Sequence, residues 1–290
     1  MLIFSVWSMT FRMIVKYPRI LLPFFIKAVF EALALTVCFY SPRSPLLAIF
    51  GPPIKSFFTT MTPSGVISGA RFLHYPLNFE LLPTLFYYGQ IFVMFTVGAI
   101  MYGMAMGMVS QAHSENEEIK ISGNFNRAAR RYFALTAIWL ITFVLSLVIL
   151  KLPPVILKKI MPPTPSAMLL LSILSYAGVV VIFVTEALFI YAYPAIIIER
   201  KGILGAIRRS FSVMSHVFLP TIVLVFVPRI FEFFYVFVRQ KQQGLMNLFG
   251  PEITLVILGA GIVLTFITDA LVFLSAANLF ILKQETEKGA

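Results

Sequence analysis

Six long runs of apolar residues alternate with short polar segments along the chain. Each run is close to or longer than the roughly 20 residues that an α-helix needs to cross the hydrocarbon core of a bilayer. The pattern predicts an all-α integral membrane bundle of six transmembrane helices, with residues 1–290 in a single polytopic domain. The predicted spans are residues 20–40, 85–109, 133–150, 168–198, 217–238 and 253–282.

Three segments outside the spans have the pattern of short amphipathic helices. Residues 1–17 place Phe4, Trp7 and Phe11 at helical spacing. Residues 124–132 and 203–214 each join an apolar stripe to neighbouring arginines, which is typical of helices that lie in the membrane interface. Residues 41–83, rich in Pro and Gly with aromatic islands, are expected to form further short helices on the membrane or over the bundle.

The remaining connections are expected to be irregular. Residues 151–165 contain five prolines, which favours a loop. Residues 239–252 read as a polar loop and residues 283–290 as a short charged tail. The fourth span is longer than a bilayer needs, so it is expected to tilt, to kink near Pro194 or to project from the membrane. Gly202 is predicted to stop the helix that precedes it.

Small residues follow one face of the second span at Ala99, Gly103 and Gly107. This four-residue spacing lets a second helix approach closely. We expect packing within the chain, with a dimer contact as the alternative.

The connection between the fourth and fifth spans has a distinct composition. A proline ends an apolar run. It is followed by an acidic residue, a glycine, an alanine and then a basic residue with a serine next to it. This arrangement resembles the polytopic family typified by the membrane domain of glycerophosphoryl diester phosphodiesterases. The soluble catalytic domain of that family has no counterpart here, so the resemblance implies a membrane domain and no catalytic residues. The matching residues are Pro194, Glu199, Gly202, Ala206, Arg209 and Ser210.

Composition supports a membrane protein and narrows its partners. The chain is 59% hydrophobic and 12% charged, with a mean hydropathy of +0.92 and a net charge of +11. The basic residues lie at the ends of apolar runs and not on one surface, which favours anionic lipid headgroups over nucleic acid. The single cysteine, Cys38, excludes an intrachain disulfide and a cysteine metal cluster.

The distribution of basic residues predicts the orientation. The segments on the side of the termini hold 13 Lys and Arg residues, close to the span ends, and the opposite loops hold eight. By the positive-inside rule, both termini are expected in the cytoplasm of a bacterial or archaeal cell, with the protein in its cytoplasmic membrane. The amphipathic helices at residues 124–132 and 203–214 would then face the anionic cytoplasmic leaflet.

Besides Glu232, five charged residues fall inside the predicted spans, where each costs about 2.5–3.5 kcal/mol unless it is paired or solvated. The lysine and glutamate of the first span are four residues apart and can pair within their helix, and Arg229 lies three residues before Glu232. The acids of the fourth and sixth spans have no such local partner. We expect structural pairing across helices, with a polar or proton-coupled pathway as the alternative. The five residues are Lys27, Glu31, Glu186, Arg229 and Asp269.

No catalytic constellation is visible. The three histidines, His74, His113 and His216, are scattered, and no phosphate-binding loop, cofactor motif or metal-spaced ligand set occurs. The sequence therefore favours a non-enzymatic protein that uses no cofactor and acts in lipid handling. Its expected partners are membrane lipid, another protein or a second copy of itself. A transporter using the acids within the spans and a membrane-embedded enzyme are the alternatives. The candidate contacts to anionic headgroups are Arg127, Arg130, Arg131, Arg208 and Arg209.

Overall fold

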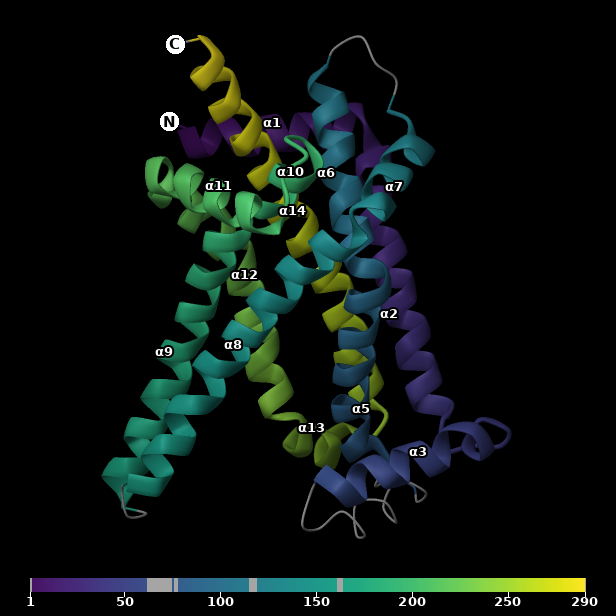
Figure 1. Cartoon of the computed structure of the whole chain (residues 1–290). Helices are drawn as coiled ribbons and strands as arrows, with labels where there is room; N and C mark the ends of the chain where they lie inside the picture. Colours follow the sequence, from purple (N-terminus) through teal and green to yellow (C-terminus); the bar gives the residue numbers. More distant parts are fainter. Residues whose placement is uncertain (1, 62–74, 76–77, 115–118, 161–163, 290) are drawn as a thin grey trace. The chain divides into compact units, whose positions relative to one another are not determined.

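The structure is a computed structural model that describes residues 2–61, 75, 78–114, 119–160 and 164–289. Every regular element in these ranges is helical (Figure 1). Six helical segments within them are long and apolar enough to cross a membrane, so the protein has the predicted all-α, multi-pass fold. The segments are Pro18–Tyr40, Asn78–His113, Tyr132–Leu157, Val180–Ile197, Phe218–Gln240 and Ile253–Glu287.

The chain divides into two compact units. The first unit contains Met1–Phe24, Ala99–Ile230 and Asp269–Ala290, and the second contains Phe25–Gly98 and Phe231–Thr268. Three helices contribute residues to both units: α2 (Leu22–Tyr40), α12 (Phe218–Gln240) and α14 (Ile253–Gly289). The other elements of the first unit are α1 (Leu2–Lys16), η1 (Pro18–Leu21), α6 (Ala99–His113), α7 (Ile121–Arg130), α8 (Tyr132–Ile160), α9 (Pro165–Phe189), α10 (Ala192–Ile197) and α11 (Ile203–His216).

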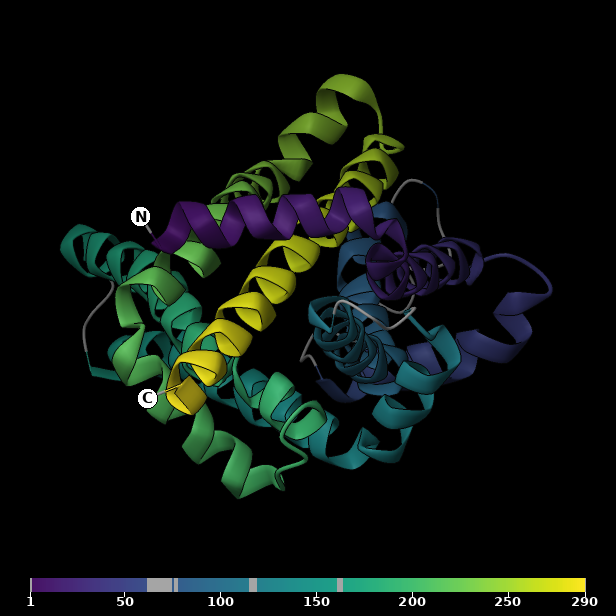
Figure 2. The same cartoon turned by 90° about the horizontal axis from the view of Figure 1, so that it is seen from above.

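The centre of the first unit is α6, in which every residue from Met101 to Val109 is buried. Helix α7 packs against α6, and α8 and α9 run side by side as an antiparallel hairpin (Figure 1). Helix α1 crosses the C-terminal half of α14 (Figure 2). At that crossing the amide of Asn278 donates to Thr10 Oγ1 at 2.9 Å, so a buried polar contact joins the two helices.

Small residues on α6 allow this close packing. A Cβ at Gly103 would lie 2.5 Å from Leu135 Cδ1 and 3.2 Å from Ala128 Cβ, and a Cβ at Gly107 would overlap the Asn124 side chain. The small-residue face therefore packs against α7 and α8 of the same chain, which confirms the prediction of packing within the chain.

The second unit has its own apolar core. Besides its parts of α2, α12 and α14, it contains α3 (Leu46–Met61), α5 (Asn78–Val93), the π-helical turn η2 (Met94–Gly98) and α13 (Gln242–Phe249). Helix α3 lies in residues 41–83, where short helices were expected. Leu35, Phe79, Phe86 and Leu258 form part of the core. In the same unit, the Arg239 guanidinium donates a hydrogen bond to the carbonyl of Pro83 at 3.0 Å.

The loop predicted for residues 151–165 is wrong for most of its length. Helix α8 continues to Ile160 with Pro153 and Pro154 inside it, and α9 begins at Pro165. Proline holds φ near the helical value, and each one removes a single backbone hydrogen bond. At the first position of α9 the missing N–H costs nothing. Residues 161–163 lie outside the described part of the chain.

Two further segments are more helical than predicted. The polar loop of residues 239–252 contains α13, and the charged tail of residues 283–290 forms the last turns of α14 as far as Gly289. Lys, Gln and Glu are good helix formers, and Lys283 lies 3.9 Å from Glu287, four residues later. Polar composition was therefore a poor guide to irregular structure here.

The amphipathic segments are helical, as predicted, with one shifted boundary. Helices α1 and α11 match residues 1–17 and 203–214 closely. Helix α7 begins at Ile121 and ends at Arg130, earlier than the predicted 124–132, and Arg131 separates it from α8. Arg131 is therefore the junction between two successive helices, α7 and α8.

The predicted kink near Pro194 is confirmed, whereas the role assigned to Gly202 is wrong. Helix α9 ends at Phe189 and α10 starts at Ala192, because a proline cannot donate to the carbonyl four residues earlier and clashes with it. Gly202 is the extended N-cap of α11, with φ −73° and ψ 174°. The left-handed residue after α10 is Arg200, with φ 57°.

Candidate functional site

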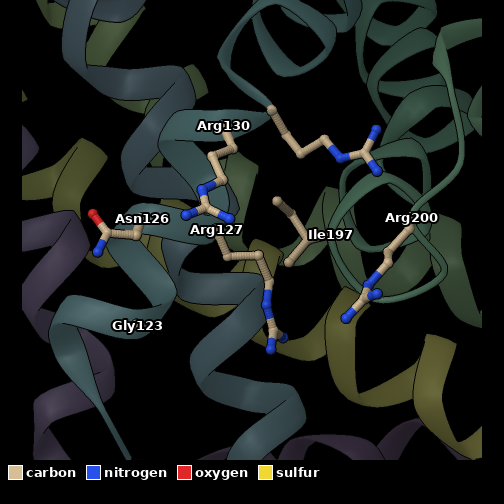
Figure 3. A pocket seen from close by; sticks show the side chains of 7 residues that line it. Gly123, Asn126, Arg127, Arg130, Ile197 and Arg200 are labelled. Carbon is tan, nitrogen blue, oxygen red and sulfur yellow. The ribbon is translucent and has the colours of Figure 1, made fainter.

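The first unit contains a pocket of about 440 Å³, lined by α7 with the adjoining Arg131 and by the end of α10 with the connection that follows it. Four arginines line it, and Arg127 and Arg130 extend from α7 on the opposite side of Ile197 from Arg200 (Figure 3). We call this site the arginine pocket. Its lining residues are Gly123, Asn126, Arg127, Arg130, Arg131, Ile197 and Arg200.

The amphipathic pattern of α7 turns its arginines toward the pocket. Asn124 and Ala128, four residues apart, are buried against α6, so Arg127 and Arg130 lie on the exposed face. Arg131 ends the helix, with its backbone N–H donating to the carbonyl of Ala128 at 3.0 Å. Basic residues in a last turn also interact favourably with the negative end of the helix dipole.

A side-chain network anchors α7 to α6. The Asn124 amide donates to Gln111 Oε1 at 2.7 Å and to the carbonyl of Lys120 at 3.0 Å. Gln111 Oε1 also accepts the backbone N–H of Lys120 at 3.1 Å. Because Gln111 belongs to α6, these contacts hold the arginine-bearing helix at a defined position beside the span.

The opposite wall comes from the connection after α10. The backbone N–H of Lys201 donates to the carbonyl of Ala195 at 3.1 Å, which closes the helix end around Arg200. A φ of 57° at this position favours glycine, and a side chain there costs on the order of 1 kcal/mol. An arginine thus occupies a strained position and lines the pocket.

The charge of the arginine pocket is not neutralised within the described part of the chain. None of its lining residues is acidic, and no described carboxylate forms an ion pair with any of its four arginines. Two other arginines in the same unit, Arg209 and Arg229, each contact two carboxylates. Among the described residues, the pocket therefore concentrates guanidinium groups without the carboxylate contacts that Arg209 and Arg229 have.

Arg209, a predicted headgroup contact, has a different place. Its Nε lies 3.0 Å from Glu199 Oε1 and its Nη2 lies 2.6 Å from Glu287 Oε2. The guanidinium also lies 5.7 Å from the centre of the Phe280 ring. The hydrogen bond to Glu287 is the main reason that the pKa of Arg209 is raised. Arg209 links α11 to α14 and to the preceding connection, whereas its neighbour Arg208 is exposed on α11.

The other motif residues build the same corner. Pro194 and Ala206 are buried, and the hydroxyl of Ser210 donates to the carbonyl of Leu188 at 2.6 Å. Together with Gly202 at the start of α11, they fix how α9, α10 and α11 follow one another. Their contacts give these residues a structural role, and none of them lines the arginine pocket.

Within the candidate spans, Arg229 brings the two acids without local partners together. Its guanidinium lies 2.5 Å from Glu186 Oε1 and 3.0 Å from Asp269 Oδ1, so it bridges α9, α12 and α14. Asp269 also accepts a hydrogen bond of 2.5 Å from the hydroxyl of Tyr102. Sequence reasoning missed Tyr102, because a tyrosine inside an apolar run gives no signal of a polar partner.

The pair predicted within the first span is formed. In the second unit, Lys27 Nζ lies 2.9 Å from Glu31 Oε1, as predicted from their four-residue spacing. Glu232 accepts a hydrogen bond from the Thr268 hydroxyl.

The described histidines have structural surroundings. His113 Nε2 lies 2.9 Å from Asn278 Oδ1, and His216 Nδ1 lies 2.8 Å from the carbonyl of Ser212. His74 lies outside the described residues. Among the described residues, no group of three His, Cys, Asp or Glu side chains could hold a metal ion.

Sequence reasoning identified three of the four pocket arginines and missed Arg200. The position of Arg200 opposite α7 depends on how α10 turns back against α8, and the amphipathic pattern of α11 starts only after it. Comparisons with protein-family models, with curated proteins and with solved structures return no match. The family resemblance therefore rests on the six motif residues alone.

Proposed function

We propose that this multi-pass membrane protein is a non-enzymatic component of membrane-lipid handling that binds anionic lipid headgroups in the arginine pocket. The observation that carries the proposal is the group of four arginines without a described carboxylate partner. Guanidinium groups form bidentate hydrogen bonds with phosphate oxygens. The pocket also adjoins Tyr132 and Ile197, which end two candidate spans, and lipid headgroups lie at such span ends.

The proposed orientation places the arginine pocket on the cytoplasmic side. The 13-to-8 excess of Lys and Arg on the side of the termini supports it. That leaflet carries anionic lipid, whose surface potential contributes about 1 kcal/mol of attraction per nearby Lys or Arg. The same excess underlies the proposal that α7 and α11 lie in the interface.

The acids within the spans are proposed to have a structural role. Arg229 supplies a cation to both Glu186 and Asp269, and Tyr102 supplies a further donor. Both acids therefore have partners within the protein, as a structural cluster requires. A transport pathway would instead require acids that water can reach. The mutual contacts of the motif residues are likewise compatible with the proposed resemblance to the phosphodiesterase membrane domains.

Removal of charge from the arginine pocket should abolish stabilisation by anionic lipid. In detergent, phosphatidylglycerol at 100 times its Kd should stabilise the wild-type protein by about 2.7 kcal/mol, and phosphatidylcholine should have little effect. The double variant Arg127→Gln with Arg130→Gln should lose most of this gain, because both side chains are exposed and their removal leaves the packing of α7 intact. Thermal unfolding measures the effect.

The matched control is Arg208→Gln, which removes an exposed arginine from α11 outside the pocket. It should retain the response to phosphatidylglycerol. High salt should weaken that response in the wild-type protein. Equal stabilisation by neutral lipid, or a double variant that responds like the wild type, would refute the proposal.

Cysteine labelling tests the orientation. In a Cys38→Ser background, Ser114→Cys and Glu285→Cys should react with an impermeant thiol reagent from the cytoplasmic side only. Gln243→Cys should react from the opposite side. All three positions are exposed, so accessibility does not limit the reaction. The reverse labelling pattern would reject the cytoplasmic placement of the termini.

A further inference from the structure

The chemistry of the arginine pocket distinguishes between classes of phosphate. Four guanidinium groups line it, none of the described lining residues carries a carboxylate, and Asn126 adds a side-chain amide. Arginine remains protonated throughout the physiological range, so the charge of these four groups does not change with pH. A ligand of charge −1 would neutralise only a small part of this charge.

A comparison within the same unit indicates how much counter-charge an arginine receives. Arg209 has Glu199 and Glu287, and Arg229 has Glu186 and Asp269. In both cases two carboxylates face one guanidinium. An occupant with more than one negative charge would restore more of this balance in the arginine pocket than a monoanion would.

The backbone at Arg200 provides an independent observation. With φ at 57°, the position favours glycine, which commonly ends helices in this conformation. The arginine there faces Arg127 and Arg130 from the other side of Ile197 (Figure 3). Strained non-glycine residues cluster at ligand sites, where the surrounding structure holds them in place. The cationic wall opposite α7 thus depends on a residue that its backbone conformation does not favour.

We propose that the arginine pocket selects a phosphomonoester dianion at the end of a lipid over a phosphodiester monoanion, an inference that rests on the proposed function. A phosphomonoester carries a charge of about −1.5 to −2 at pH 7 and presents three terminal oxygens. A phosphodiester carries a charge of −1 and presents two. The lipid source is supported by Phe133, which follows the pocket arginines at the start of α8 and is 85% exposed, as suits contact with acyl chains.

The test compares phosphatidic acid with phosphatidylglycerol of identical acyl chains. Lipid bound to the full-length protein in neutral detergent is counted by native mass spectrometry. At pH 8 we expect about tenfold tighter binding of phosphatidic acid, because electrostatic attraction scales with ligand charge. At pH 5 the second phosphate proton is bound and the preference should fall toward parity. The lining offers no other group that titrates between these pH values.

Arg200→Gly is the decisive variant, because it removes a guanidinium and supplies the residue that the backbone favours. Its thermal stability without lipid should equal or exceed that of the wild type, and its preference for phosphatidic acid should fall at least about threefold. Arg208→Gln, outside the pocket, should keep both properties.

The outcomes separate the two proposals. Equal binding of both lipids, lost together in the variant with Arg127→Gln and Arg130→Gln, would overturn the selectivity and leave headgroup binding intact. Binding that ignores every pocket substitution would overturn both. Displacement of phosphatidic acid by soluble glycerol 3-phosphate would support the dianion and identify a free phosphomonoester as an occupant; failure to displace it would support the lipid.

Discussion

Replacement of Arg229 by leucine should destabilise the protein by about 3–5 kcal/mol, because it leaves two carboxylates without their shared cation. Glu186 and Asp269 both lie within 3.0 Å of the Arg229 guanidinium. The apolar side chain that replaces it cannot stabilise their negative charge, so the loss of this cation favours proton uptake by the acids or opening of the helix packing. Thermal unfolding in detergent measures the loss.

Neutralising one acid should recover part of that loss, and the two acids should differ. The Asp269 side chain is 3% exposed and that of Glu186 is 21% exposed, so the loss of the Arg229 cation costs more at Asp269. Arg229→Leu with Asp269→Asn should therefore be more stable than Arg229→Leu with Glu186→Gln. Arg208→Leu, at an exposed position, should change stability by about 0.5 kcal/mol or less. Strictly additive losses in both double variants would mean that the cluster is not energetically coupled.

Gly103→Leu should be a strongly destabilising substitution on α6. A single Cβ at this position would already lie 2.5 Å from Leu135 Cδ1 and 3.2 Å from Ala128 Cβ. Overpacking costs about 1–3 kcal/mol and sometimes more, and three further carbon atoms place this variant at or above the upper end. Because Ala128 lies on α7, the displacement should also reduce lipid binding in the arginine pocket.

Gly259→Leu is the matched control, since a Cβ at Gly259 meets no atom within 4 Å. It should be neutral or slightly stabilising, because leucine has the higher helix propensity. Coupling to Leu135 can be measured with Gly103→Ala: the double variant with Leu135→Ala should be more stable than the sum of the single losses predicts. Equal effects of Gly103→Leu and Gly259→Leu would contradict the packing seen in the structure.

Local patterns in the sequence were sufficient for features that depend on residues near one another in the chain. The spans follow from continuous apolar length, and α1, α7 and α11 follow from helical periodicity. The Lys27–Glu31 pair follows from a four-residue spacing, which brings two side chains together on any α-helix. The kink before Pro194 follows from a missing N–H.

The loop predictions failed where they were based on the composition of a segment without its contacts to other helices. Pro153 and Pro154 suggested a loop, yet α8 continues through them beside α9. The charged residues after Leu282 suggested a free tail, yet Glu287 forms an ion pair with Arg209. In both cases contacts with a distant segment outweighed the local preference.

The sequence by itself determined that this is an all-α, multi-pass membrane protein, because hydrophobic length and periodicity are local properties. Only the tertiary structure decided the role of each arginine. Arg208 and Arg209 are neighbours, but successive residues point in different directions around a helix, so one is exposed and the other meets two carboxylates. Arg200 joins Arg127 and Arg130 in one pocket only because α10 packs back against α8, which no local pattern encodes.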